Sequence, residues 1–129
     1  MSIALLIAAI AALVCLLSHL KSYPSIIASN SWQNALSDGQ QLTLRSLFYS
    51  RSAFHLLSAA VLGASAFNYI AYGQVAMLLM FLSLIYLMQG IWFAYSYYCY
   101  YQGQGSRAWL HGLAPWVCAG AVVWFQWGG

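Results

Sequence analysis

The chain has 129 residues, of which 64% are hydrophobic and only 4% are charged. Soluble domains carry about 25% charged residues, so this composition is typical of a membrane protein and excludes an ordinary water-soluble domain. The formal net charge of +3 comes from scattered basic residues that form no patch for nucleic acid.

Four apolar stretches follow one another along the chain, at residues 2–20, 53–72, 74–98 and 108–127. A hydrocarbon core about 30 Å thick requires roughly 20 apolar residues for each crossing helix. Every stretch meets that requirement. The sequence therefore predicts an all-α fold, a polytopic membrane protein with four transmembrane helices in an antiparallel bundle. We expect a single domain over residues 1–129.

The first stretch does not read as a secretory signal, because it lacks a positively charged beginning and no small-residue cleavage site directly follows it. We expect it to be retained as the first helix. Pro24 prevents that helix from continuing, and residues 21–52 are predicted to form an interfacial loop. The end of this loop has the pattern of an amphipathic segment lying among lipid headgroups, carried by Leu44, Arg45, Leu47, Phe48 and Arg51.

The second and third stretches are separated only by a short turn, Tyr72-Gly73-Gln74. This spacing predicts an antiparallel helical hairpin. The third stretch carries Gln89-Gly90 near its middle, a candidate kink or close-packing point. It ends in a tyrosine-rich cluster, which is suited to the membrane–water interface.

The basic side chains indicate an orientation. All four lie in the first and third connections: Lys21, Arg45, Arg51 and Arg107. The positive-inside rule then predicts that loops 21–52 and 102–107 face the cytoplasm and that both termini lie outside. We expect this arrangement in a bacterial inner membrane.

The three histidines fall at the predicted cytoplasmic end, where His19 closes the first helix, His55 opens the second and His111 opens the fourth. Each continues a row of small residues at helical spacing. The rows are Ala8, Ala11, Cys15 and His19; His55, Ala59, Gly63 and Ala66; and His111, Ala114, Cys118 and Ala121. Small residues mark the faces where membrane helices approach closely, so the imidazoles should point inward or toward a neighbouring helix.

These side chains are candidate ligands. Neutral imidazoles at one depth could hold haem b or a quinone head through His19, His55 and His111. Copper or zinc could use Cys15, His19 and His55. The plainer interpretation, which we favour, is that the histidines bond to loop carbonyls, tyrosine hydroxyls or water. We therefore do not expect haem b.

The lack of acidic residues excludes several activities. The chain has no glutamate, and its single carboxylate side chain, Asp38, belongs to the long loop. A Ser-His-Asp hydrolase would lack its acid, and an ion-coupled carrier would lack its usual intramembrane carboxylate. In length and helix count the chain looks like the small multidrug resistance transporters, whose essential first-helix glutamate has no counterpart here. We expect no enzymatic activity.

Short motifs carry a resemblance: Ser18-His19-Leu20, then Leu44-Arg45 and Phe54-His55-Leu56-Leu57-Ser58, with Leu113-Ala114-Pro115 in the fourth stretch. They are similar to a pattern in small four-helix bacterial membrane proteins and, more loosely, the chain resembles the DUF423-type proteins. There a histidine ends the first helix, another begins the second, and the fourth contains proline. The chain lacks their glycine-rich first-helix ending, and the resemblance implies no activity.

Short loops, several small-residue faces and the lack of a catalytic carboxylate lead to one functional expectation. It is a non-enzymatic accessory or assembly subunit of a larger membrane complex, whose partners are the lipid bilayer and other integral membrane subunits. Two alternatives stay open. One is an electron-transfer module that uses the histidines for haem, a quinone or a metal. The other is a carboxylate-independent channel or carrier, whose path Asn68 or Gln89 would line.

Overall fold

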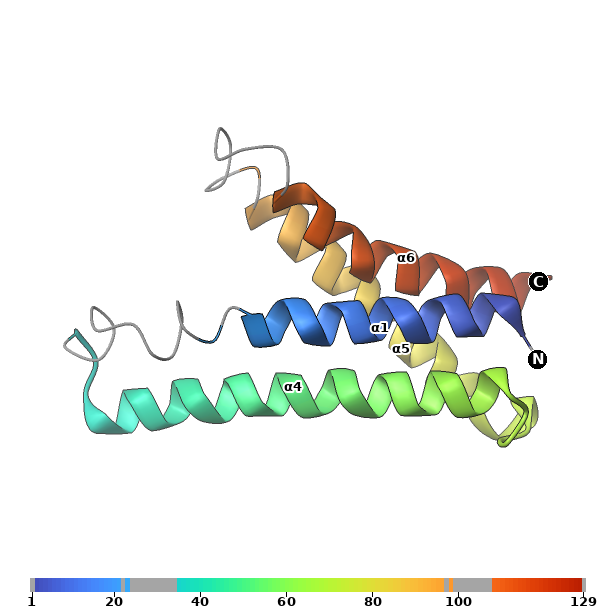
Figure 1. Ribbon diagram of the computed structural model, residues 1–129, viewed down its shortest axis with the longest axis horizontal. Helices are drawn as coiled ribbons and strands as arrows, with labels where there is room; N and C mark the ends of the chain where they lie inside the picture. The colour runs from blue at the N-terminus through green and yellow to red at the C-terminus, as the bar shows by residue number, and fades with distance from the viewer. Residues whose placement is uncertain (1, 22, 24–34, 97, 99–107, 129) are drawn as a thin grey trace.

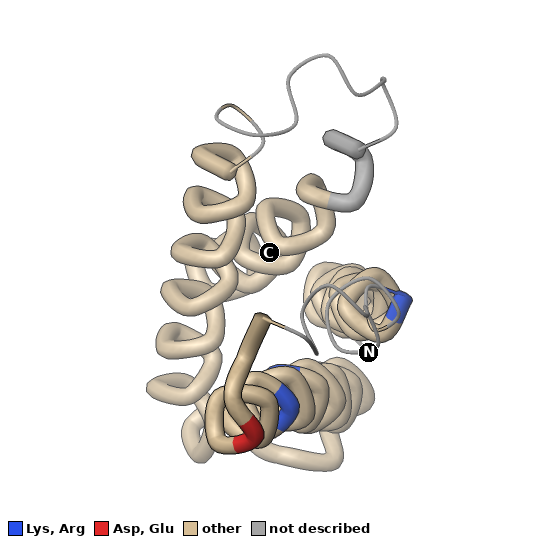
Figure 2. Tube along the Cα trace, turned by 90° about the vertical axis from the view of Figure 1, so that its left-hand side faces the viewer, with Lys and Arg blue, Asp and Glu red and all other residues tan. Residues whose placement is uncertain are grey.

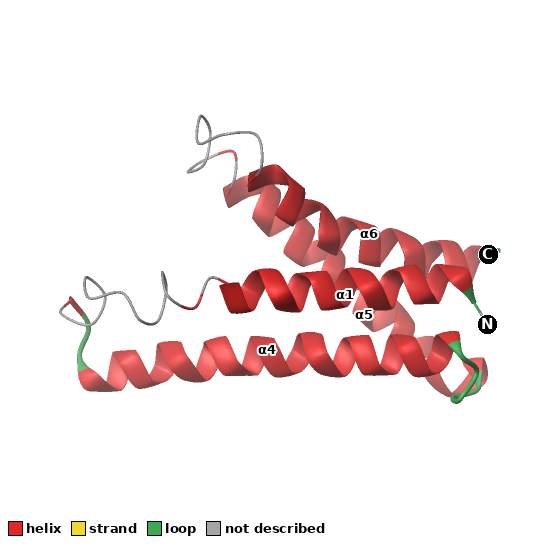
Figure 3. Cartoon of the chain, in the orientation of Figure 1, coloured by secondary structure: helices red, strands yellow, loops and turns green. Residues whose placement is uncertain are grey.

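The structure is a computed structural model that describes residues 2–21, 23, 35–96, 98 and 108–128, with the backbone only for 108–111. Four long helices make up most of this part (Figure 3): α1 (Ile3–Lys21), α4 (Asp38–Ala66), α5 (Tyr72–Ser96) and α6 (Ala108–Trp127). No strand occurs among the described residues, which confirms the all-α prediction. Two of the helices, α1 and α5, are long and apolar enough to cross a membrane.

The helices are arranged around α1, which packs against both α4 and α6, while α5 packs mainly against α6. Successive helices run in opposite directions, so the start of α1, the end of α6 and the α4–α5 turn lie at one end of the molecule (Figure 1). At that end the backbone N–H of Ser2 donates to the carbonyl of Ala66 over 2.8 Å.

The hairpin prediction for the second and third helices needs a correction. Residues 67–71 form the turn, so α5 already begins at Tyr72. Although this turn is short, α4 and α5 contact each other little. The reason is that the small residues of α1 let it approach α4 and α6 closely, and this packing holds α4 and α5 on different neighbours.

The bundle core confirms that the small-residue rows face inward. On α1, Ala8 is fully buried, and Ala11 and Cys15 are nearly so; on α6, Cys118 is fully buried. Larger side chains fill the remaining space, among them Leu5, Leu62, Leu79 and Val122. Gly63 is the exception, because it is only half-buried and a Cβ added there would meet nothing within 4 Å.

The second helix begins much earlier than predicted. α4 starts at Asp38 rather than at residue 53, and it ends at Ala66 rather than at 72. The predicted interfacial loop 21–52 is therefore wrong for residues 38–52. The amphipathic segment expected at the headgroups is instead the continuous first half of α4, which extends past the end of α1 (Figure 1).

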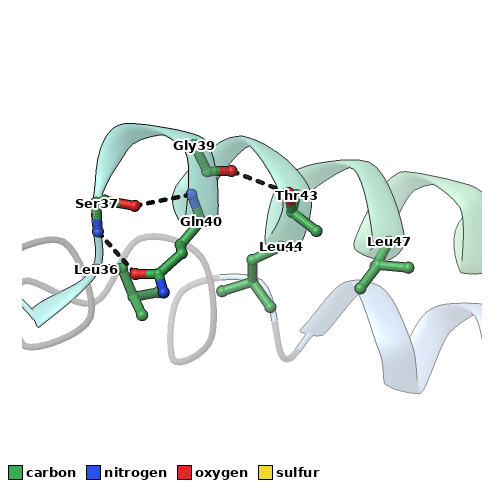
Figure 4. Close-up of a pocket in the computed structure, with 7 residues that line it drawn as sticks. All are labelled: Leu36, Ser37, Gly39, Gln40, Thr43, Leu44 and Leu47. Atoms are coloured by element: carbon green, nitrogen blue, oxygen red, sulfur yellow. Dashed lines mark hydrogen bonds between the residues drawn. The ribbon is translucent and has the colours of Figure 1, made fainter.

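A capping box explains this start (Figure 4). The Ser37 hydroxyl accepts the backbone N–H of Gln40 over 3.3 Å, and the Gln40 side-chain oxygen accepts the backbone N–H of Ser37 over 3.0 Å. Asp38 in the first turn adds a negative charge where the helix dipole favours one. These local interactions begin a helix that apolar periodicity alone does not reveal.

The contact between α5 and α6 confirms Gly90 as a close-packing point. A Cβ at Gly90 would lie only 2.8 Å from Cε2 of Trp116. Glycine therefore lets the indole ring lie directly against the α5 backbone. Nearer the other end, the Gln126 amide donates to the carbonyl of Ala76 over 3.0 Å. α5 and α6 are therefore held together both near Gly90 and near Gln126.

The described basic residues lie on α1 and α4, at the end opposite the α4–α5 turn. They are Lys21, Arg45 and Arg51, and Figure 2, which looks onto this end, shows them in blue. Arg107 and the loop 102–107 lie outside the described residues. The basic residues that the structure describes therefore gather at one end of the fold, as predicted.

Candidate functional site

The end of α1 is joined to α4 through His19. Its Nε2 atom donates to the backbone carbonyl of Phe48 over 2.9 Å, since a carbonyl oxygen can only accept. The imidazole also stacks on the Phe48 ring, with centroids 3.9 Å apart and an interplanar angle of 24°. His19 is half-buried, and its ring orientation is set by these two contacts.

His55 lies deeper, in the middle of α4 rather than in its first turn. It is fully buried, and its Nδ1 atom lies 2.9 Å from the hydroxyl of Tyr86 on α5, which is also fully buried. The ring of Phe54 packs against both partners, with centroids 5.7 Å from each. The Phe54 ring therefore packs beside the hydrogen bond that joins α4 to α5 at this point.

The two histidines are neighbours, as the sequence predicts. Their ring centroids lie 6.1 Å apart with an interplanar angle of 59°. We call His19, His55 and Tyr86 the histidine–tyrosine cluster. The backbone of His111 lies in the first turn of α6, but its side chain is outside the described residues. The structure thus brings together two of the three predicted cofactor ligands.

The proposed metal ligands do not gather as a metal ion requires. Among the described side chains, no three His, Cys, Asp or Glu residues form such a group. Cys15 is buried on α1 as a free thiol, one turn before His19. His19 already uses Nε2 for the Phe48 carbonyl. Cys15, His19 and His55 therefore provide an adjacent imidazole pair rather than a three-ligand centre.

Several buried polar atoms make no hydrogen bond within the described part of the chain. They are His55 Nε2, Ser58 Oγ, Ser65 Oγ and Gln89 Oε1. Ser58 lies near the Tyr86 hydroxyl but does not reach it with hydrogen-bond geometry. Unsatisfied groups of this kind are uncommon in folded proteins and usually have a structural or functional reason.

The other polar residues expected in the apolar stretches behave differently from one another. Asn68 lies in the α4–α5 turn, exposed and with a left-handed φ of 64°. Asparagine tolerates that conformation better than most residues. The Ser83 hydroxyl donates over 2.7 Å to the carbonyl of Met80 in its own helix.

Tyr86 is the member of the histidine–tyrosine cluster that sequence reasoning missed. A signal for it is present, because Val75, Leu79, Leu82 and Tyr86 follow at steps of four, three and four. These steps define one helix face. A tyrosine on that face, within an apolar span, needs a buried partner for its hydroxyl.

The start of α4 also forms a surface hollow, which Figure 4 shows. Its lining is Leu36, Ser37, Gly39, Gln40, Thr43, Leu44 and Leu47. The polar groups there are engaged in helix capping, and the Thr43 hydroxyl donates to the carbonyl of Gly39 over 2.9 Å. This lining contains no ionisable side chain. The histidine–tyrosine cluster is therefore the stronger candidate site.

Comparisons of this chain with models of protein families, with curated proteins and with solved structures find no match.

Proposed function

We propose that the chain is an integral membrane protein that crosses a bacterial inner membrane four times and serves as an accessory or assembly subunit of a larger membrane complex. The end of the bundle that holds Lys21, Arg45 and Arg51 faces the cytoplasm, and both termini lie outside. This proposal has three supports: the apolar outer surface, the separation of charge, and small residues that face outward on α4.

The outer surface supports a hydrocarbon environment. α1 exposes large apolar side chains along its outer face: Ile3, Ile7, Ile10, Leu13, Val14, Leu17 and Leu20. α5 does the same with Met77, Phe81, Leu84, Met88, Ile91 and Trp92. Soluble monomers rarely expose continuous apolar surfaces of this extent. Lipid, or the helices of partner subunits, would cover them.

The length of α4 supports an orientation along the membrane normal. At about 1.5 Å per residue, its 29 residues extend about 43 Å, which exceeds a hydrocarbon core of about 30 Å. The last 20 residues of α4, 47–66, rise about 30 Å and would cross the core beside α1. The start of α4, with Arg45, would project into the headgroup region and the cytoplasm, where the positive-inside rule favours basic residues. The long side chain of Arg51 would reach toward the same interface.

The observation that carries the subunit role is an outward row of small residues on α4. Ala53 and Ala60 are exposed, and open space surrounds Gly63. Spacings of seven and three residues put them on neighbouring positions of one face. In membranes, faces of this kind are where helices approach each other closely. The described bundle leaves this face uncovered, so a helix of another subunit could pack on it.

The test is purification in mild detergent at native expression level, with the mass of the intact complex measured. We expect the chain to copurify in fixed stoichiometry with other integral membrane subunits. Ala60→Leu should abolish that association, because a larger side chain blocks close approach while the space around α4 leaves the fold intact. Leu13→Ile on the outer face of α1 is the control. Recovery of the monomer alone would contradict the proposal.

A second candidate function has one observation in its favour. The His19 and His55 rings are adjacent, and Nε2 of His55 has no partner among the described residues. An electron-transfer module would use this pair for haem, a quinone or a metal. The absorption spectrum and metal content of the purified protein decide the matter. A haem band or stoichiometric metal supports this alternative, and a colourless, metal-free protein removes haem and metal from it.

A further inference from the structure

The basic end of the bundle carries two cations that have no counter-ion in the described part of the chain. Lys21 ends α1 and Arg45 lies on α4, and both side chains are exposed. Asp38 is the only acidic side chain of the sequence. It lies two turns before Arg45, about 10 Å along the helix axis, and no ion pair joins it to either cation. The two charges are therefore available to an anion from outside the chain.

Aromatic contacts hold the end of α1 against this part of α4. The ring of Tyr23, two residues after Lys21, packs edge-on against Phe48 with centroids 5.4 Å apart. The Phe48 ring in turn lies 6.1 Å from that of Tyr49. The hydroxyl groups of Tyr23 and Tyr49 lie close enough to interact. The segment that carries Lys21 is thereby fixed beside residues 48 and 49 of α4.

Arg45 lies on the same side of α4 as Tyr49, because the two positions are one turn apart. Its guanidinium acts electrostatically on the Tyr49 hydroxyl, so its charge lies near the tyrosine pair. We call Lys21, Tyr23, Arg45 and Tyr49 the basic–tyrosine cluster. Arg51 is not part of it, because it follows Arg45 by six residues and therefore lies about 120° round the helix.

We propose that the basic–tyrosine cluster binds the phosphate group of an anionic phospholipid. The guanidinium of Arg45 offers paired N–H donors to two phosphate oxygens, and the ammonium of Lys21 adds a second positive charge. The Tyr23 hydroxyl donates to that of Tyr49, which is the more exposed of the two and donates its own proton to the phosphate. The site rests on the proposed membrane insertion, which brings this end to the cytoplasmic headgroups, and not on the subunit role.

The surface next to the cluster suits a lipid better than a free anion. Arg45, Tyr49 and Leu56 lie on one face of α4, at steps of four and seven residues. The Leu56 side chain is 56% exposed. It lies roughly 16 Å from Arg45 along the helix, in the part of α4 that would cross the hydrocarbon core. A lipid with its phosphate at the cluster therefore has an acyl chain along Leu56. Anionic lipids also give the cytoplasmic leaflet its negative surface potential.

Lipid binding to the purified full chain tests the site. The protein is kept in a neutral detergent, and native mass spectrometry measures its binding of phosphatidylglycerol or phosphatidylcholine as the lipid concentration rises. We expect one phosphatidylglycerol to bind at least about fivefold more tightly than phosphatidylcholine. Arg45→Gln and Lys21→Gln should each weaken its binding about fivefold. Equal affinities for the two lipids would overturn the site.

Two further variants separate a defined site from a general attraction to positive charge. Arg51→Gln removes the same charge from another side of α4, so it should leave phosphatidylglycerol binding unchanged. Tyr49→Phe keeps every charge and removes one hydroxyl, so it should weaken binding several-fold. All of the substituted positions are exposed, and the bundle core stays intact. Equal losses in Arg45→Gln and Arg51→Gln would overturn the site, as would full binding by Tyr49→Phe.

Inorganic phosphate distinguishes the lipid from a free anion. Added to the lipid-bound protein at the concentration of the lipid, it should displace no phosphatidylglycerol, because only the lipid contacts Leu56. Displacement would overturn the lipid assignment. The subunit role is judged separately. A monomer that binds the lipid would contradict that role and keep the site, whereas a complex that does not distinguish the two lipids would overturn the site alone.

Discussion

Nδ1 of His55 lies 2.9 Å from the hydroxyl oxygen of Tyr86, and this bond joins two helices that otherwise contact each other little. Both side chains are fully buried, and their ring centroids lie 5.6 Å apart. A hydrogen bond within a low-dielectric interior has few competitors, and its loss leaves the partner atom unsatisfied. The pair should therefore fix α4 against α5.

Tyr86→Phe tests this link. The variant keeps the ring but leaves Nδ1 of His55 without its partner, so we expect the free energy of unfolding to fall by about 1–3 kcal/mol. Reversible unfolding in mixed detergent micelles measures the change. Tyr95→Phe, at an exposed position, is the control and should have little effect. Equal stabilities of the two variants would show that the hydrogen bond contributes nothing to the fold.

Two glycines should respond oppositely to the same substitution. A Cβ at Gly90 would lie 2.8 Å from the Trp116 ring, so Gly90→Ala should destabilise the protein by about 1–3 kcal/mol. A Cβ at Gly63 meets nothing within 4 Å, so Gly63→Ala should stabilise α4 by about 0.5–1 kcal/mol. The same unfolding assay compares them. A stabilised Gly90→Ala variant would contradict the close packing of α5 on α6.

The start of α4 depends on its capping box. Ser37→Ala removes the hydroxyl that accepts the Gln40 N–H, and we expect a loss of about 1 kcal/mol in the first turn of the helix. Hydrogen–deuterium exchange at the amides of the first turn should become faster, while exchange near His55 stays unchanged. In the unmodified chain, the amides of the first turn should exchange more slowly than those of an unfolded peptide. Equal rates would show that α4 begins later.

Much of the fold can be predicted from apolar runs alone. The predicted stretches 2–20, 74–98 and 108–127 agree with α1, α5 and α6 to within about two residues at each end. The start of α4 was missed because residues 38–52 mix polar and apolar side chains. Ser37-x-x-Gln40 is nevertheless a readable capping signal in the sequence.

The candidate site could be predicted only in part. The nearness of His19 and His55 follows from their shared end and from the small residues on their faces. Tyr86 was overlooked because the sequence is rich in tyrosines, and most of those singled out belong to a terminal cluster. The sequence pattern also did not predict which helices pack against each other, because every helix is apolar on most sides. Close contacts such as that between Gly90 and Trp116 determine the pairing.

The account depends most on α4 crossing the membrane, and cysteine accessibility tests this directly. The three native cysteines are replaced by alanine, and a single cysteine is introduced as Gln40→Cys or Tyr69→Cys. Both positions are exposed: Gln40 lies in the first turn of α4, and Tyr69 lies in the α4–α5 turn at the opposite end. A membrane-impermeant maleimide is then applied to intact cells and to lysed cells.

We expect Tyr69→Cys to react in intact cells and Gln40→Cys to react only after lysis. The reverse pattern would keep the crossing and overturn the orientation. Reaction of both positions from the same side of the membrane would contradict the four-helix transmembrane arrangement itself.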